Sequence, residues 1–204
     1  FQDSDVAKWL EAVSYSLETD PDVELEKEAD QVIDILEKAQ QPDGYLDTYY
    51  LIKEPGMRWS NLREGHELYV AGHMIEAGIA YYHATGKRKL LEIVMRMADC
   101  ICNTFGEEPE KIQGCPGHPE IELALIKLYR LIGEKRYLDK ALYFINLRGD
   151  QQPNRFDLEQ KKNGFHHIFP EFSYLGYNNI QAHLPVRQQK KADGHAVRAL
   201  YLYS

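Results

Sequence analysis

The sequence predicts an all-α fold made of helical hairpins that form part of an (α/α) barrel, on three observations. Apolar residues recur every three or four positions over most of the 204 residues, which is the period of amphipathic helices. No segment shows a convincing run of the apolar and polar alternation typical of a strand. A ten-residue pattern also occurs twice, beginning at Tyr82 and again 47 positions later at Tyr129.

The first two helices are predicted from capping residues and apolar stripes. Asp3, Ser4 and Asp5 can cap a helix that continues to about Leu17. A second helix begins after Asp20-Pro21, because proline is favoured in a first helical turn. Its apolar stripe consists of Leu25, Ala29, Val32, Ile33 and Leu36.

Five further helices are predicted. Asn61 and Glu64 resemble a capping box that opens a long helix ending before Gly86. The others span residues 87–105, 119–132, 137–147 and 192–203, and the second of these is closed by Gly133.

The repeated pattern indicates how these helices are arranged. Residues 82–91 and 129–138 each place a glycine between two helical runs, as in the turn of a helical hairpin. Such hairpins cannot bury their apolar faces alone, so they stack into an open solenoid or a closed α/α barrel. In both arrangements alternate helices begin at the same end.

Two segments lack helical periodicity. Residues 40–59 combine turn residues with aromatics, and residues 151–191 are rich in Asn, Gln, Gly, Pro and aromatics. The aromatics of the second segment argue against disorder; they are Phe165, Phe169, Phe172, Tyr174 and Tyr177. Both segments are predicted to form walls of a cleft, with packing arms as the alternative.

Composition excludes several classes of partner. The net charge of −8 and the scattered Lys and Arg residues oppose a nucleic-acid partner. No apolar run approaches the ~20 residues of a membrane span, because His73 and Glu76 interrupt the best candidate, residues 68–82. No membrane partner is therefore expected.

The cysteines indicate the cellular compartment of the protein, and the chain ends indicate whether the sequence is part of a longer protein. Cys100, Cys102 and Cys115 lack a disulfide framework spacing and are predicted to be buried free thiols, which favours a reducing, cytoplasmic compartment. The compartment itself stays unknown, because the sequence opens at Phe1 without a leader and stops at Ser204 inside a helical pattern. Both ends are expected to be cut from a longer protein.

Gly-His pairs are the most informative local feature. With 14 Gly and 8 His, chance would produce about half of one pair, yet four occur. Those at His66, His118 and His195 stand at or near the start of apolar helical runs, and the fourth is Gly72-His73. Helices that begin at one end would bring the three histidines to a shared rim. The alternative is that they are only structural caps.

A histidine at a helix N-terminus is expected to be neutral, because the helix dipole disfavours imidazolium. A neutral ring can donate from one nitrogen and accept at the other, which suits sugar hydroxyls. His118 is predicted to be a cap with a free ring, since Pro119 is favoured as the first helical residue.

Other chemistry finds little support. His66-Glu67 fails as a zinc-protease helix motif because position 70 is Val70. Cys115 and His118 lack a second ligand pair at zinc-site spacing, and no phosphate-binding glycine loop or nucleophile elbow is present. No carboxylate pair can be named from spacing as glycosidase catalysts. A helical cup with neutral histidines and aromatics fits carbohydrate best.

Seven runs, in order, carry a family resemblance. They are residues 3–12 (DSDVAKWLEA), 43–46 (DGYL), 58–62 (RWSNL), 66–69 (HELY), 116–125 (PGHPEIELAL), 181–187 (QAHLPVR) and 194–199 (GHAVRA). Together they resemble glycoside hydrolase family 127, the non-reducing-end β-L-arabinofuranosidases. The resemblance implies an (α/α)6 barrel in which His66, His118 and His195 contact a terminal L-arabinofuranose.

The same resemblance implies retaining hydrolysis by a cysteine thiolate beside a zinc ion held by Glu and Cys, with a Glu as acid/base. Those residues, later barrel helices and β domains are expected beyond Ser204. Residues 1–204 are therefore expected to form an incomplete catalytic domain without catalytic groups or metal ligands, inactive alone, whose exposed faces are covered by self-association or left prone to it. The alternatives are another α/α-barrel carbohydrate enzyme, such as a lyase or an unsaturated uronyl hydrolase, and a helical-repeat interaction module.

Overall fold

A computed structural model describes residues 1–164 and 167–204, and these residues form α-helices and short turns with no strand beyond one isolated bridge. The predicted all-α fold is confirmed. The helices are α1 (Asp3–Thr19), α2 (Val23–Ala39), α3 (Glu67–Thr85), α4 (Lys89–Thr104), α5 (Ile121–Ile132), α6 (Lys135–Leu147), α7 (Arg155–Asn163) and α8 (Ala196–Tyr203). Single turns occur at Tyr49–Lys53, Pro170–Phe172, Tyr177–Ile180 and Val186–Gln188.

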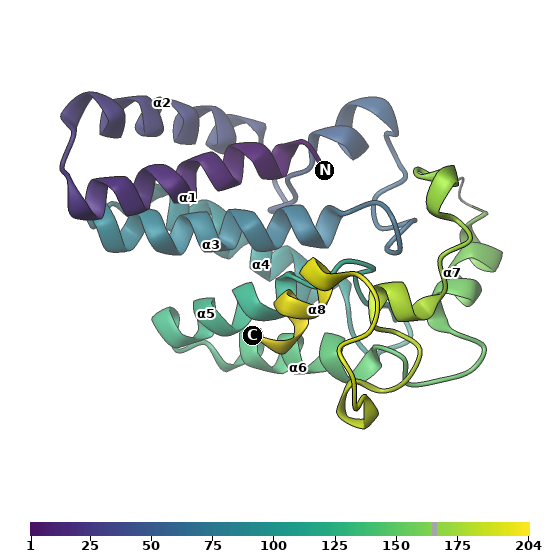
Figure 1. The fold of residues 1–204 in the computed structure, drawn as a ribbon. Helices are drawn as coiled ribbons and strands as arrows, with labels where there is room; N and C mark the ends of the chain where they lie inside the picture. Colours follow the sequence, from purple (N-terminus) through teal and green to yellow (C-terminus); the bar gives the residue numbers. More distant parts are fainter. Residues whose placement is uncertain (165–166) are drawn as a thin grey trace.

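The helices lie in two layers, as Figure 1 shows. In one layer α1 packs on α3, α3 on α5, and α5 on α8; in the other, α4 packs between α2 and α6. Each hairpin thus contributes one helix to each layer. This alternation fits part of an (α/α) barrel.

Helix α3 lies at the centre of the molecule, between α1 and α5 and against α4. Every residue from Glu67 to Tyr81 is buried, including the polar side chains of His73 and Glu76. Among the described residues no helix is both long and apolar enough to cross a membrane.

The predicted hairpin turns are confirmed. Gly86 ends α3 and Gly133 ends α5, with φ angles of 71° and 82° that a residue with a side chain rarely adopts. Their backbone N–H groups donate to the carbonyls of Tyr82 and Tyr129, the first residues of the two repeat copies.

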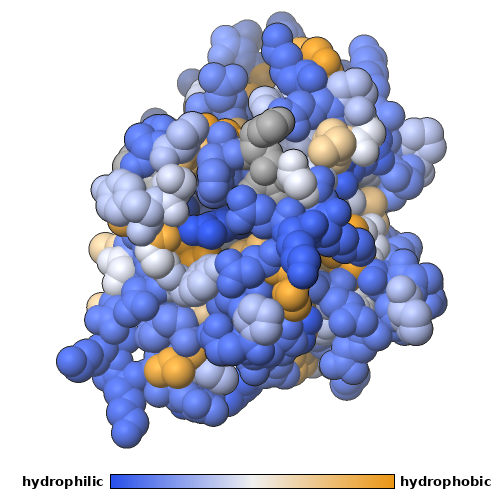
Figure 2. Space-filling model, turned by 90° about the vertical axis from the view of Figure 1, so that its right-hand side faces the viewer, coloured by the Kyte–Doolittle hydropathy of each residue, from blue (hydrophilic) through white to orange (hydrophobic). Residues whose placement is uncertain are grey.

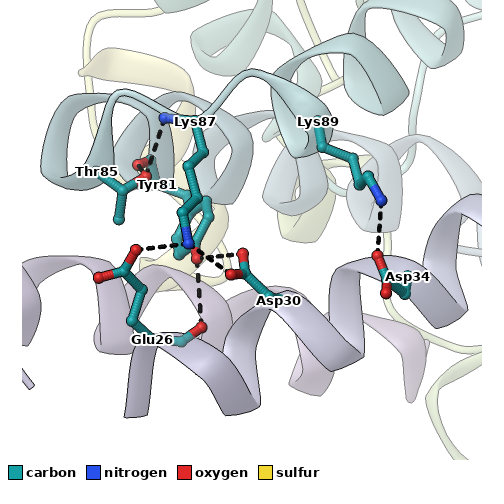
Figure 3. Close-up of polar contacts among 7 residues, drawn as sticks. All are labelled: Glu26, Asp30, Asp34, Tyr81, Thr85, Lys87 and Lys89. Atoms are coloured by element: carbon teal, nitrogen blue, oxygen red, sulfur yellow. Dashed lines mark hydrogen bonds and ion pairs between the residues drawn. The ribbon is translucent and has the colours of Figure 1, made fainter. Parts of the chain in front are cut away.

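Ion pairs tie α2 to the hairpin of α3 and α4 (Figure 3). Lys87 Nζ lies 2.5 Å from both Glu26 Oε1 and Asp30 Oδ2, and Lys89 Nζ lies 2.7 Å from Asp34 Oδ1. Such partly exposed pairs contribute at most ~1 kcal/mol each. Burial of Ala29 and Ile33 is therefore the main attachment of α2.

Several predicted helix starts are wrong. Asn61 accepts a bond from the Glu64 amide at 3.0 Å, as a cap would, but the chain makes a turn there and α3 begins only at Glu67. Pro119 is not helical, because α5 begins at Ile121. The last helix begins at Ala196 instead of residue 192.

One helix in the segment predicted to be irregular, α7, was missed. Asn154 caps it by accepting a bond from the Phe156 amide, and Phe156 is its only buried residue. A nine-residue helix with one buried side chain leaves no apolar period in the sequence. Phe165, one of the aromatics that argued against disorder, lies outside the described residues.

Another expectation concerns burial. The three cysteines are buried and free, as predicted.

An apolar groove of about 580 Å³ runs between α1 and α2, where Trp9 and Ile35 are exposed. Self-association through such a face stays a prediction.

Candidate functional site

Three of the Gly-His histidines, His66, His118 and His195, come together at one end of the layer formed by α1, α3, α5 and α8. The ring centroids of His66 and His118 lie 5.8 Å apart, and those of His118 and His195 lie 6.2 Å apart. The predicted shared rim is confirmed. The rings line a cavity of about 340 Å³, which is also lined by Phe1, Arg63, Glu64, Phe169, Leu175, Asn179, Ile180 and Arg198.

Figure 2 shows the end of the molecule at which α1 and α3 begin. This face is mostly hydrophilic, and hydrophobic residues are exposed in a hollow near its centre. A polar rim around an apolar recess is the usual form of a small-molecule site.

Local backbone structure positions each histidine differently. His66 is the N-cap of α3 and adopts a left-handed conformation with φ 59°. His195 is the N-cap of α8, and its ring Nδ1 accepts from the Arg198 amide at 3.5 Å. His118 is not a cap, because Glu120 occupies that position in α5.

The glycines of these pairs allow close approach of neighbouring segments. A Cβ atom on Gly117 would lie 1.9 Å from the Arg63 carbonyl oxygen, and one on Gly194 would lie 2.0 Å from that of Asn178. Gly117 therefore lets the loop before His118 pack against the loop before His66, and Gly194 lets the chain before His195 pack against the turn Tyr177–Ile180.

The partners of each ring fix its tautomer. His66 Nδ1 contacts the Glu64 carbonyl oxygen, and His118 Nδ1 contacts the Pro119 carbonyl oxygen at 2.8 Å. Each Nδ1 must then donate, so each Nε2 is an acceptor. The prediction of a free His118 ring is therefore wrong for Nδ1, which is engaged by the Pro119 carbonyl. His195 has the opposite tautomer, because its Nδ1 accepts from the Arg198 amide and its Nε2 therefore carries the proton.

All three imidazoles are neutral, as predicted, and burial is the main cause. Burial lowers the pKa of His66 to about 4 and that of His118 to about 3, although backbone carbonyl contacts act in the opposite direction. The pKa of His195 is also lowered, by burial and by the Arg198 charge. The rim thus offers uncharged donors and acceptors at neutral pH.

The irregular segment of residues 151–191 forms a wall of this cavity, as predicted. Its apolar contributors are Phe169, Leu175 and Ile180. Glu64 holds the segment in place, because its carboxylate pairs with His167 Nδ1 at 2.6 Å and accepts from the Ile168 amide at 2.7 Å.

The other irregular segment, residues 40–59, contributes no lining residue to the histidine cavity, but Arg58 and Trp59 join residues 155–163 in the wall of another cavity, so the prediction that both segments form walls of a cleft is confirmed there. This separate cavity has a volume of about 420 Å³. Residues 40–59 are also tied to the start of α3, since Glu67 accepts bonds from the Tyr45 hydroxyl and the Trp59 amide.

The cysteines are poorly suited to nucleophilic or metal chemistry. Burial raises the pKa of Cys102 to about 11 and that of Cys115 to about 12, and it also raises the pKa of Cys100. Cys115 lines the separate cavity with Trp59, and His118 lines the histidine cavity. The described residues thus offer no thiolate to the histidines.

Sequence reasoning missed three residues of the site. Tyr69 packs 4.5 Å from the His118 ring, Tyr201 packs 5.7 Å from the same ring, and Arg198 lines the cavity. Two of them follow a named histidine by three positions, His66 to Tyr69 and His195 to Arg198. Side chains three apart on a helix are neighbours, so this spacing was the available signal.

The arrangement can be compared with known proteins. Residues 1–203 match the family described as β-L-arabinofuranosidase, GH127 catalytic domain. The chain belongs to this family. The GH127 chain is 48% identical to the non-reducing end β-L-arabinofuranosidase of Bifidobacterium longum subsp. longum, over 99% of its own length and 31% of that protein.

Solved GH127 structures share its fold. A β-L-arabinofuranosidase of Geobacillus stearothermophilus T6 is 60% identical, with a TM-score of 0.94 over 100% of this chain and 32% of its own. A second GH127 β-arabinofuranosidase is 40% identical, with a TM-score of 0.82 over 100% of this chain and 30% of its own. The chain therefore spans about a third of the length of these relatives.

Proposed function

We propose that this GH127 chain supplies the sugar-contacting part of an enzyme that releases terminal β-L-arabinofuranose from arabinose-containing oligosaccharides or glycoconjugates. The observation that carries the proposal is the group of three neutral imidazoles around one cavity, on His66, His118 and His195. Residues 1–204 would be one part of the catalytic barrel, with further barrel helices and β domains elsewhere in the enzyme.

The chemistry of the cavity supports a furanose ligand. Nε2 of His66 and of His118 can accept from sugar hydroxyls, whereas His195 Nε2 can donate. The rings of Phe1 and Phe169, 5.3 and 5.9 Å from the His66 ring, add an apolar surface for the carbon face of a sugar. A cavity of about 340 Å³ suits a ligand of one or two sugar units.

Bond cleavage needs groups that this cavity does not contain. Glu64 is the only carboxylate among the described lining residues, and its oxygens are engaged by residues 167–169. The cysteine nucleophile and the Glu-and-Cys zinc site implied by the family resemblance find no fit at the three described cysteines, whose thiols are buried and protonated, and the histidine cavity offers no free Glu as acid/base. We place those groups outside residues 1–204 and derive no step through the metal.

The test uses an enzyme as long as the relatives and 4-nitrophenyl β-L-arabinofuranoside as substrate. We expect His118→Gln to lower kcat/KM by ~100-fold, because it removes a positioned hydrogen-bonding group. His66→Gln and His195→Gln should also lower it. His83→Gln, an exposed histidine near the end of α3, is the matched control and should leave kcat/KM unchanged.

Two further arms complete the test. Zinc chelation should abolish turnover by the long enzyme, and residues 1–204 alone should show no turnover above a contaminant control. Activity of this chain alone, or full activity of all three histidine variants, would contradict the proposal.

One observation favours a second candidate within the same class of enzymes. Arg63 and Arg198 both line the cavity, and guanidinium groups bind carboxylates well. An unsaturated uronide should therefore be assayed in parallel. Its cleavage in place of the arabinoside would favour the uronyl hydrolase alternative. Absence of any sugar binding would favour the interaction module.

A further inference from the structure

The fourth Gly-His pair has no role in the histidine cavity. His73 lies in the middle of α3, is 3% exposed, and neither of its ring nitrogens has a hydrogen-bond partner. A buried polar group without a partner is costly and suggests a missing ligand. Glu11 of α1 and Glu76 of α3 place carboxylate oxygens beside it, and the candidate ligand atoms of the three residues all lie within 4.8 Å of one another.

A fourth side chain, Glu120, completes this cluster from the start of α5. Glu120 is fully buried, and no donor bonds to either of its oxygens. Its Oε1 lies 3.7 Å from His73 Nδ1. A Cβ atom on residue 72 would lie 1.4 Å from its Oε2, so Gly72 is what admits this carboxyl beside α3.

The charges of the cluster do not balance. Three carboxyl groups, of Glu11, Glu76 and Glu120, face two ammonium groups: that of Lys127, which pairs with Glu76, and that of Lys8, whose charge also acts on the His73 ring. Either a proton or a cation must therefore compensate the carboxylates.

The candidate ligands keep free coordination positions and can be reached from the surface. Lys127 donates to Glu76 Oε1, and the Tyr15 hydroxyl donates to Glu11 Oε1. The carboxyl of Glu120 also lies beside that of Glu76, and a carboxylate oxygen has lone pairs for more than one partner. A cavity of about 500 Å³ lined by Glu11, Glu76 and His83 opens beside them. A cation would have an entry path.

We infer that Glu11, His73 and Glu76 bind a divalent transition-metal cation such as Mn²⁺ or Zn²⁺. One imidazole nitrogen with carboxylate oxygens suits these ions better than Mg²⁺ or Ca²⁺, which prefer oxygen alone. Glu120 would accept from the second His73 nitrogen, the usual outer partner of a metal-bound histidine.

This site is separate from the histidine cavity, and the Tyr69 ring lies between the two. Tyr69 packs 4.5 Å from the His73 ring on one side and 4.5 Å from the His118 ring on the other. A cation bound by Glu11, His73 and Glu76 would join α1 to α3 next to that cavity. The inference does not depend on the proposed glycosidase activity.

The experiment titrates Mn²⁺ into the purified chain and follows the electron paramagnetic resonance signal of free Mn²⁺. We expect one bound ion per chain, with affinity that falls below neutral pH as protons compete for the carboxylates. His73→Gln and Glu76→Gln should each weaken binding by at least ~10-fold. Co²⁺ in place of Mn²⁺ should add a visible absorption band that these substitutions remove.

Matched controls separate this site from others. Glu18→Gln changes a carboxylate that lines the same cavity outside the cluster, and His66→Gln changes the histidine cavity; both should bind Mn²⁺ like the parent. Glu11→Gln tests the same site with less risk to the fold than His73→Gln, because Glu11 is only half-buried. It too should weaken Mn²⁺ binding. Far-ultraviolet circular dichroism checks each fold.

Two results would overturn the inference. One is no binding above that of a nonspecific surface, which would mean that a proton shared by Glu76 and Glu120 compensates the cluster. The other is equal affinity in all variants, which would place the ion elsewhere.

Discussion

Contacts of individual atoms determine the protonation and the tautomers of the histidines in this site. The helix dipole was the expected cause of neutral histidines, yet burial is the largest contribution at His66 and His118, and His118 lies outside its helix. The carbonyl partner of each ring then selects the tautomer. Glycines act at the same scale, because a missing Cβ lets a carbonyl or carboxylate oxygen approach α3 or a loop.

Gly72→Ala tests this steric argument. The added Cβ would meet Glu120 Oε2 and lie 3.1 Å from the Ile121 backbone nitrogen, so the start of α5 must move. We expect the free energy of unfolding to fall by about 1–3 kcal/mol, despite the better helix propensity of alanine. Urea denaturation measures it. Gly176→Ala, with open space around it, should change stability by less than ~0.5 kcal/mol; equal effects at the two positions would refute the argument.

At the scale of elements, the start of α3 organises the segments around it. Glu67, its first residue, is 3% exposed and accepts from the Tyr45 hydroxyl at 2.5 Å and the Trp59 amide at 2.8 Å. These bonds tie residues 40–59 to the helix that carries His66. Burial raises the Glu67 pKa to about 8.

This pKa predicts a pH dependence of stability. Between pH 4.5, the ordinary pKa of a glutamate, and about pH 8, the folded state holds a proton on Glu67 that the unfolded state releases. The associated stability is therefore complete below pH 4.5 and is lost as the pH rises through 8. From pH 5 to 9 the parent should lose roughly 2–5 kcal/mol relative to Glu67→Gln. Guanidinium unfolding of both proteins at pH 5, 7 and 9 measures the difference, and parallel pH profiles would show that Glu67 does not titrate this way.

On the scale of the whole molecule, one buried arginine connects distant parts of the site. Arg148, after α6, donates to the Ile180 carbonyl at 2.9 Å, to the Pro116 carbonyl at 2.6 Å and to Glu122 Oε1 at 3.1 Å. It thereby joins α5, the loop before His118 and the cavity wall at Ile180. No local pattern marked this residue in the sequence.

Arg148→Met should lower the free energy of unfolding by about 3–5 kcal/mol, because Glu122 would be left buried without its partner. The double variant Arg148→Met/Glu122→Leu should recover part of that loss, since it removes the unpaired charge as well. Chemical denaturation of the single and double variants measures this coupling. A double variant no more stable than Arg148→Met would show that the carbonyl contacts, and not the ion pair, dominate.

Local sequence patterns determined the helices and candidate histidines, because helical period, caps and turn glycines act over a few residues. They located α1, α2, α4 and α6 within a few positions and grouped His66, His118 and His195 through the repeated hairpin, and the seven runs indicated the family that the comparisons confirm. They failed where the structural signal is weak, as at α7.

Only the tertiary structure decided which of the two irregular segments forms a wall of the histidine cavity, and which carboxylates meet His73. Glu11 lies in α1, His73 in α3 and Glu120 just before α5, and the packing of these helices is set by their apolar faces, not by the polar residues themselves. The neutrality of the buried histidines likewise depends on how much water the assembled helices exclude. Burial and convergence of this kind are properties of long-range packing, which a local period does not encode.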